Sequence, residues 1–203
     1  MKHYSLVTRT CGVWLLAVLF MMPLTSFHAV SAAGSPLALT QVSASVKRQI
    51  QGYLDKAWAH YQKKEYDEAL KWWHMAAKHD TPAAQYNIAL CYERGTGVDA
   101  DMEKAVSWYK KAAEQNFPGA QYNLAYCYAE GRGVAQDYKA AARWWKAAAE
   151  QGLAEAQYNL GWCYYEGHGV KQNYDEAVKW YRRAAEQGNA DAIAALSELG
   201  ELE

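Results

Sequence analysis

Residues 84–92 read AQYNIALCY, and the same nine positions return as AQYNLAYCY at 120–128 and as AQYNLGWCY at 156–164, an offset of 36 residues each time. Each copy continues into a glycine loop of the form G-x-G-V, which begins at Gly95, Gly131 and Gly167. A pair of aromatic residues and then a pair of alanines close every copy. A match of this length at one fixed offset indicates an internal repeat.

Each copy predicts two helices joined by the glycine loop. In the first copy, Ala84, Ile88 and Tyr92 recur at every fourth residue and form one apolar helix face. Gly95 supplies the left-handed turn that ends this helix, and residues 105–113 show the spacing of a second one. A single hairpin cannot bury both of its faces, whereas stacked hairpins can. The sequence therefore predicts an all-α solenoid.

These motifs resemble the Sel-one-like repeats (SLR), a branch of the tetratricopeptide superfamily, in the A-x-x-x-L-x-x-x-Y helix, the G-x-G-V loop, the A-x-x-W-Y segment and the final A-A. The resemblance implies a right-handed α-solenoid of about four hairpins and a C-terminal capping helix. The expected units are a tetratricopeptide-like hairpin at 45–83, SLR repeats at 84–119, 120–155 and 156–191, and the cap at 192–203. The first hairpin lacks the glycine loop.

The first 33 residues are typical of a secretory signal peptide. They contain no acidic residue, carry Lys2 and Arg9, and hold a 13-residue apolar run from Gly12 to Leu24, followed by small residues. A membrane-spanning helix needs roughly 20 apolar residues, so we expect cleavage and no membrane insertion afterwards. Residues 34–44 are then a flexible leader, and the protein is expected in the periplasm. Retention as an anchor, or an intracellular protein with a misplaced start, are the alternatives.

Composition excludes one class of partner. The chain of 203 residues has 21 Lys plus Arg against 22 Asp plus Glu, which gives a net charge of −1 and argues against a charge-driven nucleic-acid partner. Aromatic residues make up 14% of the chain, with nine tryptophans, as in a packed protein rather than a disordered one.

Most repeated residues are expected to be structural. Four tryptophans and six loop glycines fall in this group: Trp72, Trp108, Trp144, Trp180, Gly95, Gly97, Gly131, Gly133, Gly167 and Gly169. Cys91, Cys127 and Cys163 occupy one position in successive first helices. Packed helices lie about 8–10 Å apart and a disulfide needs Cα atoms within about 7 Å, so these thiols are predicted to be free and packed.

The chain offers little for catalysis. It has no H-E-x-x-H, no serine nucleophile elbow and no phosphate-binding glycine loop, and its thiols share no spacing with a histidine. We therefore expect no catalytic residue, no metal and no cofactor, and a protein that binds without converting its ligand.

The expected binding surface rests on the resemblance. In the tetratricopeptide superfamily the first helices line a concave groove, and an amide after the conserved aromatic often grips a peptide. The resemblance implies that a protein or peptide partner binds a groove formed by Tyr86, Asn87, Leu90, Tyr122, Asn123, Tyr126, Tyr158, Asn159 and Trp162. These side chains could instead serve only packing. Neither the identity of the partner nor the oligomeric state follows from the sequence.

Two other functions are compatible with the sequence. Stacked aromatic residues and amides also suit sugar faces, so a glycan- or peptidoglycan-binding envelope protein is one alternative. The other is an enzyme that acts on cell-wall precursors or β-lactams, as suggested for Cys-rich secreted SLR proteins. Those proteins carry two cysteines per repeat, whereas each repeat here has one.

Overall fold

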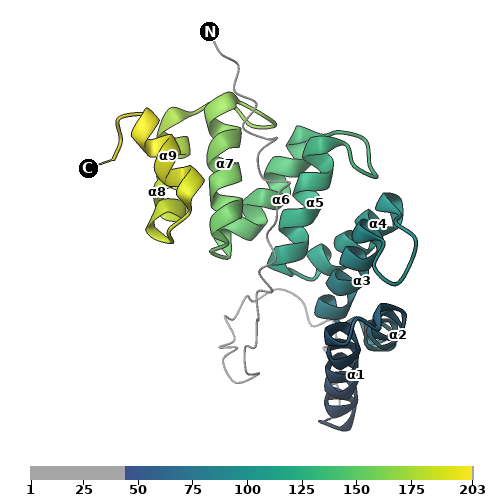
Figure 1. Cartoon of the computed structure of the whole chain (residues 1–203). Helices are drawn as coiled ribbons and strands as arrows, with labels where there is room; N and C mark the ends of the chain where they lie inside the picture. The colour runs from purple at the N-terminus through teal and green to yellow at the C-terminus, as the bar shows by residue number, and fades with distance from the viewer. Residues whose placement is uncertain (1–43, 203) are drawn as a thin grey trace, which may run out of the picture. The chain divides into compact units, whose positions relative to one another are not determined.

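The computed structural model describes residues 44–202, in which nine helices and no strands occur (Figure 1). The predicted signal peptide and residues 34–43 of the predicted leader lie outside this part of the chain. The helices are α1 (Ala44–Gln62), α2 (Tyr66–Ala77), α3 (Pro82–Arg94), α4 (Met102–Glu114), α5 (Pro118–Glu130), α6 (Tyr138–Glu150), α7 (Ala154–Glu166), α8 (Tyr174–Glu186) and α9 (Ala190–Glu198).

The helices form four hairpins, α1–α2, α3–α4, α5–α6 and α7–α8, followed by the single helix α9. Each helix packs against the helix before it and the helix after it in the chain. This arrangement confirms the predicted all-α solenoid of four hairpins and one terminal helix. Within the described residues, no helix is both long enough and apolar enough to cross a membrane.

Local sequence sets both ends of the helices. The side chains of Asp101, Asp137 and Asn173 cap the second helices α4, α6 and α8 by accepting hydrogen bonds from backbone N–H groups of the first turn. The first helices α3, α5 and α7 each end in a left-handed glycine, as at Gly95, where φ is 66°. The repeated cap and glycine explain why these three hairpins have helices of equal length.

The second glycine of each loop joins neighbouring hairpins. A Cβ atom on Gly133 would lie 2.4 Å from the backbone oxygen of Met102, the first residue of α4. Gly97 meets the backbone of Tyr66 in the same way, and Gly169 meets that of Tyr138. Each loop is thus docked on the start of the preceding hairpin's second helix, an approach that only glycine permits. We refer to this contact as the loop dock.

The core consists of small residues and large rings. Alanines fill the tightest contacts, and Trp73, Tyr109, Trp145 and Tyr181 are at most 3% exposed. Trp108 and Trp144 pack between hairpins, because each of them contacts the hydrophobic core clusters on both sides of it. The rings therefore bind each hairpin to the next and dominate the buried apolar area.

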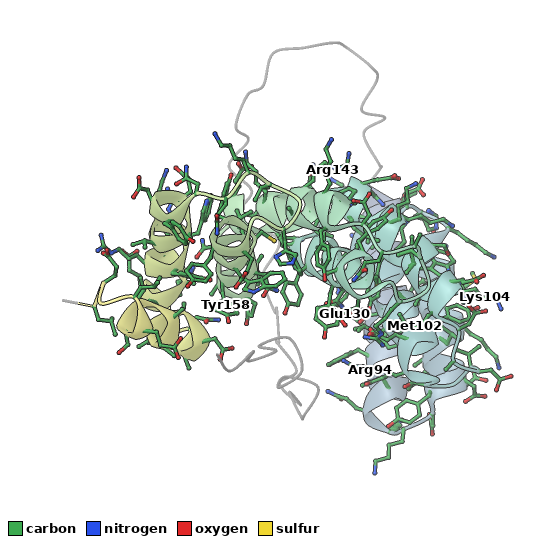
Figure 2. The ribbon with its side chains drawn as sticks, turned by 90° about the horizontal axis from the view of Figure 1, so that it is seen from above. Arg94, Met102, Lys104, Glu130, Arg143 and Tyr158 are labelled. Atoms are coloured by element: carbon green, nitrogen blue, oxygen red, sulfur yellow. The ribbon has the colours of Figure 1, made fainter. Side chains whose placement is uncertain are left out.

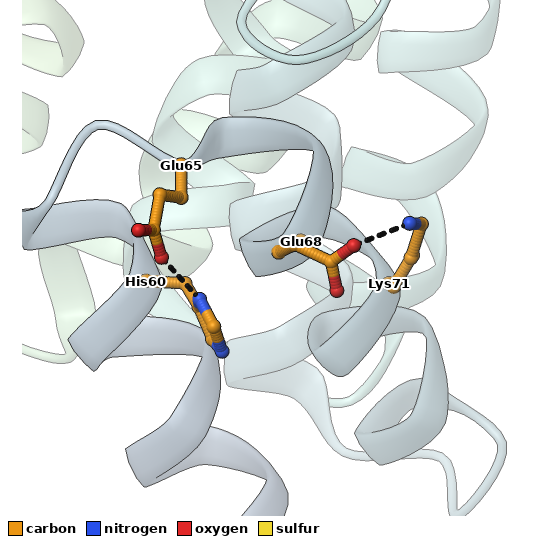
Figure 3. Close-up of polar contacts among 4 residues, drawn as sticks. All are labelled: His60, Glu65, Glu68 and Lys71. Atoms are coloured by element: carbon orange, nitrogen blue, oxygen red, sulfur yellow. Dashed lines mark hydrogen bonds and ion pairs between the residues drawn. The ribbon is translucent and has the colours of Figure 1, made fainter.

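The first hairpin closes differently. Three residues, Lys63 to Glu65, join α1 to α2, and Lys64 adopts a left-handed φ of 63°. The His60 Nδ1 atom lies 2.6 Å from a carboxylate oxygen of Glu65 across this turn, and Lys71 pairs with Glu68 one turn further along α2 (Figure 3). These contacts replace the glycine loop of the other hairpins.

Candidate functional site

The candidate site is the part of α3, α5 and α7 that carries the residues predicted to form a groove, here called the first-helix face. All nine residues predicted to form a groove lie on these three helices, and each is half-buried. Figure 2 shows Tyr158 and Glu130, from α7 and α5, on one side of the ribbon and Arg143, from α6, on the other. The predicted residues thus lie at matching positions of three first helices, but several also contact the second helices, as Tyr86 and Asn123 do with Tyr109 of α4.

The three asparagines already donate hydrogen bonds within the protein. Asn87 Nδ2 donates to the carbonyl of Ala83, 2.9 Å away on its own helix, and Asn123 Nδ2 donates to the Tyr109 hydroxyl at 3.0 Å. Asn159 donates to the hydroxyl of Tyr122. Each amide therefore has a structural role, and a partner would compete for the amide hydrogens or use the Oδ1 atoms.

The tyrosines preceding the asparagines are wedged between helices. Tyr86 packs against Phe117 and Tyr109, with ring centroids 5.1 and 5.9 Å away, and Tyr158 packs against Tyr181 at 5.6 Å. Burial, followed by nearby carboxylates, raises the pKa of Tyr122 and of Tyr158 to about 12. These phenols stay protonated near neutral pH and can act as hydrogen-bond donors or acceptors.

The third row varies in residue type. Leu90, Tyr126 and Trp162 occupy one repeat position, directly before a cysteine that is identical in all three copies. Trp162 is held in place by His168, whose ring stacks on it with centroids 4.7 Å apart, while Tyr138 meets the His168 ring edge-on. A large, half-buried apolar side chain therefore lies at the same place on each of the first helices α3, α5 and α7.

Sequence reasoning missed the buried amide row, which consists of glutamines rather than asparagines. Gln85, Gln121 and Gln157 are at most 5% exposed. Gln121 accepts a hydrogen bond from Gln151 Nε2 at 2.7 Å and donates to the carbonyl of Ala113 at 3.2 Å, near the end of α4. This amide adds a second donor to a helix-end carbonyl that also accepts the backbone N–H of Asn116 at 2.9 Å. The sequence did offer a signal for this row, because a glutamine directly precedes Tyr-Asn in all three copies.

A second polar network joins Glu93 of α3, Tyr109 of α4 and Arg132 of the loop that follows α5. The Tyr109 hydroxyl donates to a carboxylate oxygen of Glu93 at 2.5 Å, and Arg132 lies 3.4 Å from the other oxygen of the same carboxylate. In the next two repeats, Ala129 and Tyr165 stand where Glu93 does, so no carboxylate is available there. Trp145, at the position of Tyr109, keeps a buried Nε1 atom with no hydrogen-bond partner among the described residues.

The thiols are poor nucleophiles. Cys91, Cys127 and Cys163 are free and buried, and burial raises the pKa of each to about 12. A thiol with such a pKa is almost entirely protonated near neutral pH and therefore unreactive.

The Sel1 repeat family model matches residues 60–80, 82–117, 118–153 and 154–189. The first match covers α2 and the end of α1, in the hairpin without a glycine loop. No curated protein matches the chain.

Solved structures share the fold. A Sel1 repeat protein from Oxalobacter formigenes is 39% identical over 70% of this chain and 59% of its own, with a TM-score of 0.67. A protective antigen of uropathogenic Escherichia coli with an SLR fold is 36% identical over 77% of this chain and 36% of its own, with a TM-score of 0.72. Helicobacter pylori cysteine rich protein B is 26% identical over 64% of this chain and 96% of its own, with a TM-score of 0.52.

The chain therefore spans only part of the length of the first two of these relatives. The four matches to the family model together cover more than half of the chain, and they coincide with the hairpins of the structure. The chain belongs to the Sel1 repeat family.

Proposed function

We propose that this protein is a non-catalytic interaction scaffold that holds a segment of a partner protein along its first-helix face. Sel1 repeat proteins generally mediate protein–protein interactions, which supports a scaffold role. The observation that carries the proposal is the row of Leu90, Tyr126 and Trp162. These three side chains are large and apolar and stay half-buried on successive first helices, and a row of incompletely covered apolar surface is typical of a binding surface.

The chemistry of the site supports binding over catalysis. The thiols are protonated and buried, and the asparagine and glutamine amides are tied into hydrogen bonds of the fold. Among residues 44–202, no group of three His, Cys, Asp or Glu side chains is arranged to hold a metal ion. What the face offers a ligand is aromatic surface and amide oxygens, which suit a peptide segment.

Export to the periplasm is part of the proposal and rests on the N-terminal sequence alone. Cell fractionation followed by N-terminal sequencing tests it. The expected product is a periplasmic protein that begins near Gly34; an intact Met1 on a cytosolic protein would contradict export.

Site-specific photo-cross-linking in the native cells tests the binding face. A benzophenone amino acid replaces Tyr126 on the first-helix face in one variant and Arg143 on the opposite face in a matched control. We expect a protein adduct from position 126 and none from position 143. Equal adducts from both positions would move the site elsewhere, and an adduct containing glycan strands instead of protein would favour the peptidoglycan-binding alternative.

A further inference from the structure

Charge is separated between the two sides of the hairpins. The helices α5, α7 and α9 contain five acidic residues and no Lys, Arg or His: Glu130, Glu155, Glu166, Asp191 and Glu198. The second helices α4, α6 and α8 contain nine Lys and Arg residues against six Asp and Glu residues. The protein's small net charge therefore conceals an acidic series of first helices and a lysine- and arginine-rich series of second helices.

The acidic residues of the first helices also lack ion-pair partners. All five are exposed, and none forms an ion pair with another residue of the described part of the chain. The second helices behave differently, because Glu114 lies 4.0 Å from Lys110 and Glu150 lies 3.8 Å from Lys146. A carboxylate at the C-terminal end of a helix is unfavourable for the helix dipole, so Glu130, Glu166 and Glu198 add nothing to helix stability.

Three of these carboxylates act on the aromatic residues of the first-helix face. Burial is the largest cause of the raised pKa of Tyr122 and of Tyr158. The charges of Glu155 and Asp191 also raise the pKa of Tyr122, and those of Asp191 and Glu198 also raise the pKa of Tyr158. Carboxylates from α7 and α9 therefore lie within electrostatic range of the phenols of α5 and α7. Tyr158 and Trp162 also pack against the core cluster that contains Ala192 and Leu196 of α9, so these rings lie beside the helix that carries Asp191 and Glu198.

We propose that this part of the first-helix face binds an extended peptide segment that carries Lys or Arg side chains. The proposal rests on the proposed function and names the chemistry of its partner. The surface, here called the acidic aromatic patch, consists of Tyr122, Tyr158, Trp162, Glu155, Asp191 and Glu198. Aromatic rings attract a Lys or Arg cation over their faces, and carboxylates receive its N–H groups in strong charge-assisted hydrogen bonds.

Electrostatic complementarity also decides against other ligands. An acidic segment or a phosphate-bearing polymer would be repelled by the five unpaired carboxylates, which favours a basic segment over both.

The acidic aromatic patch has a defined limit along the array. Among the first helices, α3 carries one acid and one base, Glu93 and Arg94. The helix α1 carries Lys47, Arg48 and Lys56 against the single acid Asp55. A bound segment therefore places its positive side chains toward α7 and α9, and a neutral or acidic end toward α1. This gradient fixes the direction of the segment.

Fluorescence anisotropy of the full chain with three labelled peptides tests the proposal. The peptides share one extended sequence and carry Arg, Gln or Glu at alternate positions. We expect saturable binding of the Arg peptide, at least about tenfold weaker binding of the Gln peptide, and no binding of the Glu peptide at about 0.15 M salt. Failure of the Arg peptide to bind, or equal binding of the Arg and Gln peptides, would overturn the proposal.

Two variants of equal charge locate the binding surface. One combines Glu155→Gln, Asp191→Asn and Glu198→Gln on the acidic aromatic patch, and the control combines Glu103→Gln, Glu114→Gln and Glu150→Gln on the second helices. Both lose three negative charges. We expect the first variant to raise the Kd for the Arg peptide at least about tenfold and the control to change it less than about threefold. Equal losses would show non-specific attraction and overturn the proposal.

Circular dichroism of both variants first establishes that they are as helical as the parent. The two proposals then fail separately. If cross-linking from position 126 captures a protein while the Arg peptide does not bind, the first-helix face is a binding site and the basic partner is wrong. If cross-linking from position 126 captures no protein, the proposed function fails as well.

Discussion

Replacing Gly133 with alanine tests the loop dock between hairpins. Gly133 has a φ of +67°, and an alanine there costs about 1–2 kcal/mol because its Cβ approaches the following carbonyl oxygen. The new Cβ would also lie 2.4 and 2.5 Å from the backbone O and C atoms of Met102, which cannot move aside as a side chain can. Forcing an extra methyl into a packed contact costs a further 1–3 kcal/mol or so.

The matched control is Gly131→Ala in the same loop. Gly131 has nearly the same φ, +69°, but its Cβ would meet nothing closer than 3.4 Å, so only the backbone cost of about 1–2 kcal/mol applies. Urea unfolding followed by circular dichroism is expected to show Gly133→Ala less stable than Gly131→Ala by about 1–3 kcal/mol. Equal stability of the two variants would refute the loop dock. A reduced m value in Gly133→Ala would show that its hairpins unfold separately.

Two further predictions concern the core. Cys127 has a folded pKa of about 12 against about 8.5 for the thiol of an unfolded chain, so above pH 9 the unfolded chain binds fewer protons and stability falls as pH rises. When the pH rises from 7.5 to 9.5, the free energy of unfolding should therefore fall by about 1 kcal/mol less in Cys127→Ala than in the parent. An equal fall in both proteins would contradict burial of the thiol. Gln121→Met removes the buried amide that donates to the Ala113 carbonyl and accepts from Gln151, and should cost about 1–3 kcal/mol. The exposed Gln151→Met should cost under about 1 kcal/mol in the same urea assay, and the reverse order would contradict the buried amide row.

The repeat made the hairpins predictable. Its fixed spacing aligns the apolar faces, the caps and the loop glycines of successive copies. Each of these signals depends only on residues that are close together in the sequence. The loopless first hairpin was also visible, because its aromatic residues follow one another too closely for a seven-residue connection. Local signals of this kind need no knowledge of what packs against them.

The site was less predictable because its details depend on contacts between helices. Gln121 and Asn123 are both polar residues of one helix, and nothing local shows that the first is buried against Gln151 while the second meets Tyr109. The absence of ion pairs at Glu155 likewise depends on which side of the hairpin its helix presents. The acidic composition of the first helices could be seen in the sequence. Its relevance to binding became clear only when the structure showed which helices pack beside one another.

The loop dock also makes the array extensible. Tyr66, Met102 and Tyr138 begin second helices and each lies under the loop of the next repeat, whereas Tyr174 at the same position is 55% exposed. Every 36-residue unit thus brings both a loop that inserts and a helix start that receives one. Duplication of residues 154–189 by recombination would yield a longer protein in one step, with Tyr174 covered by the added loop.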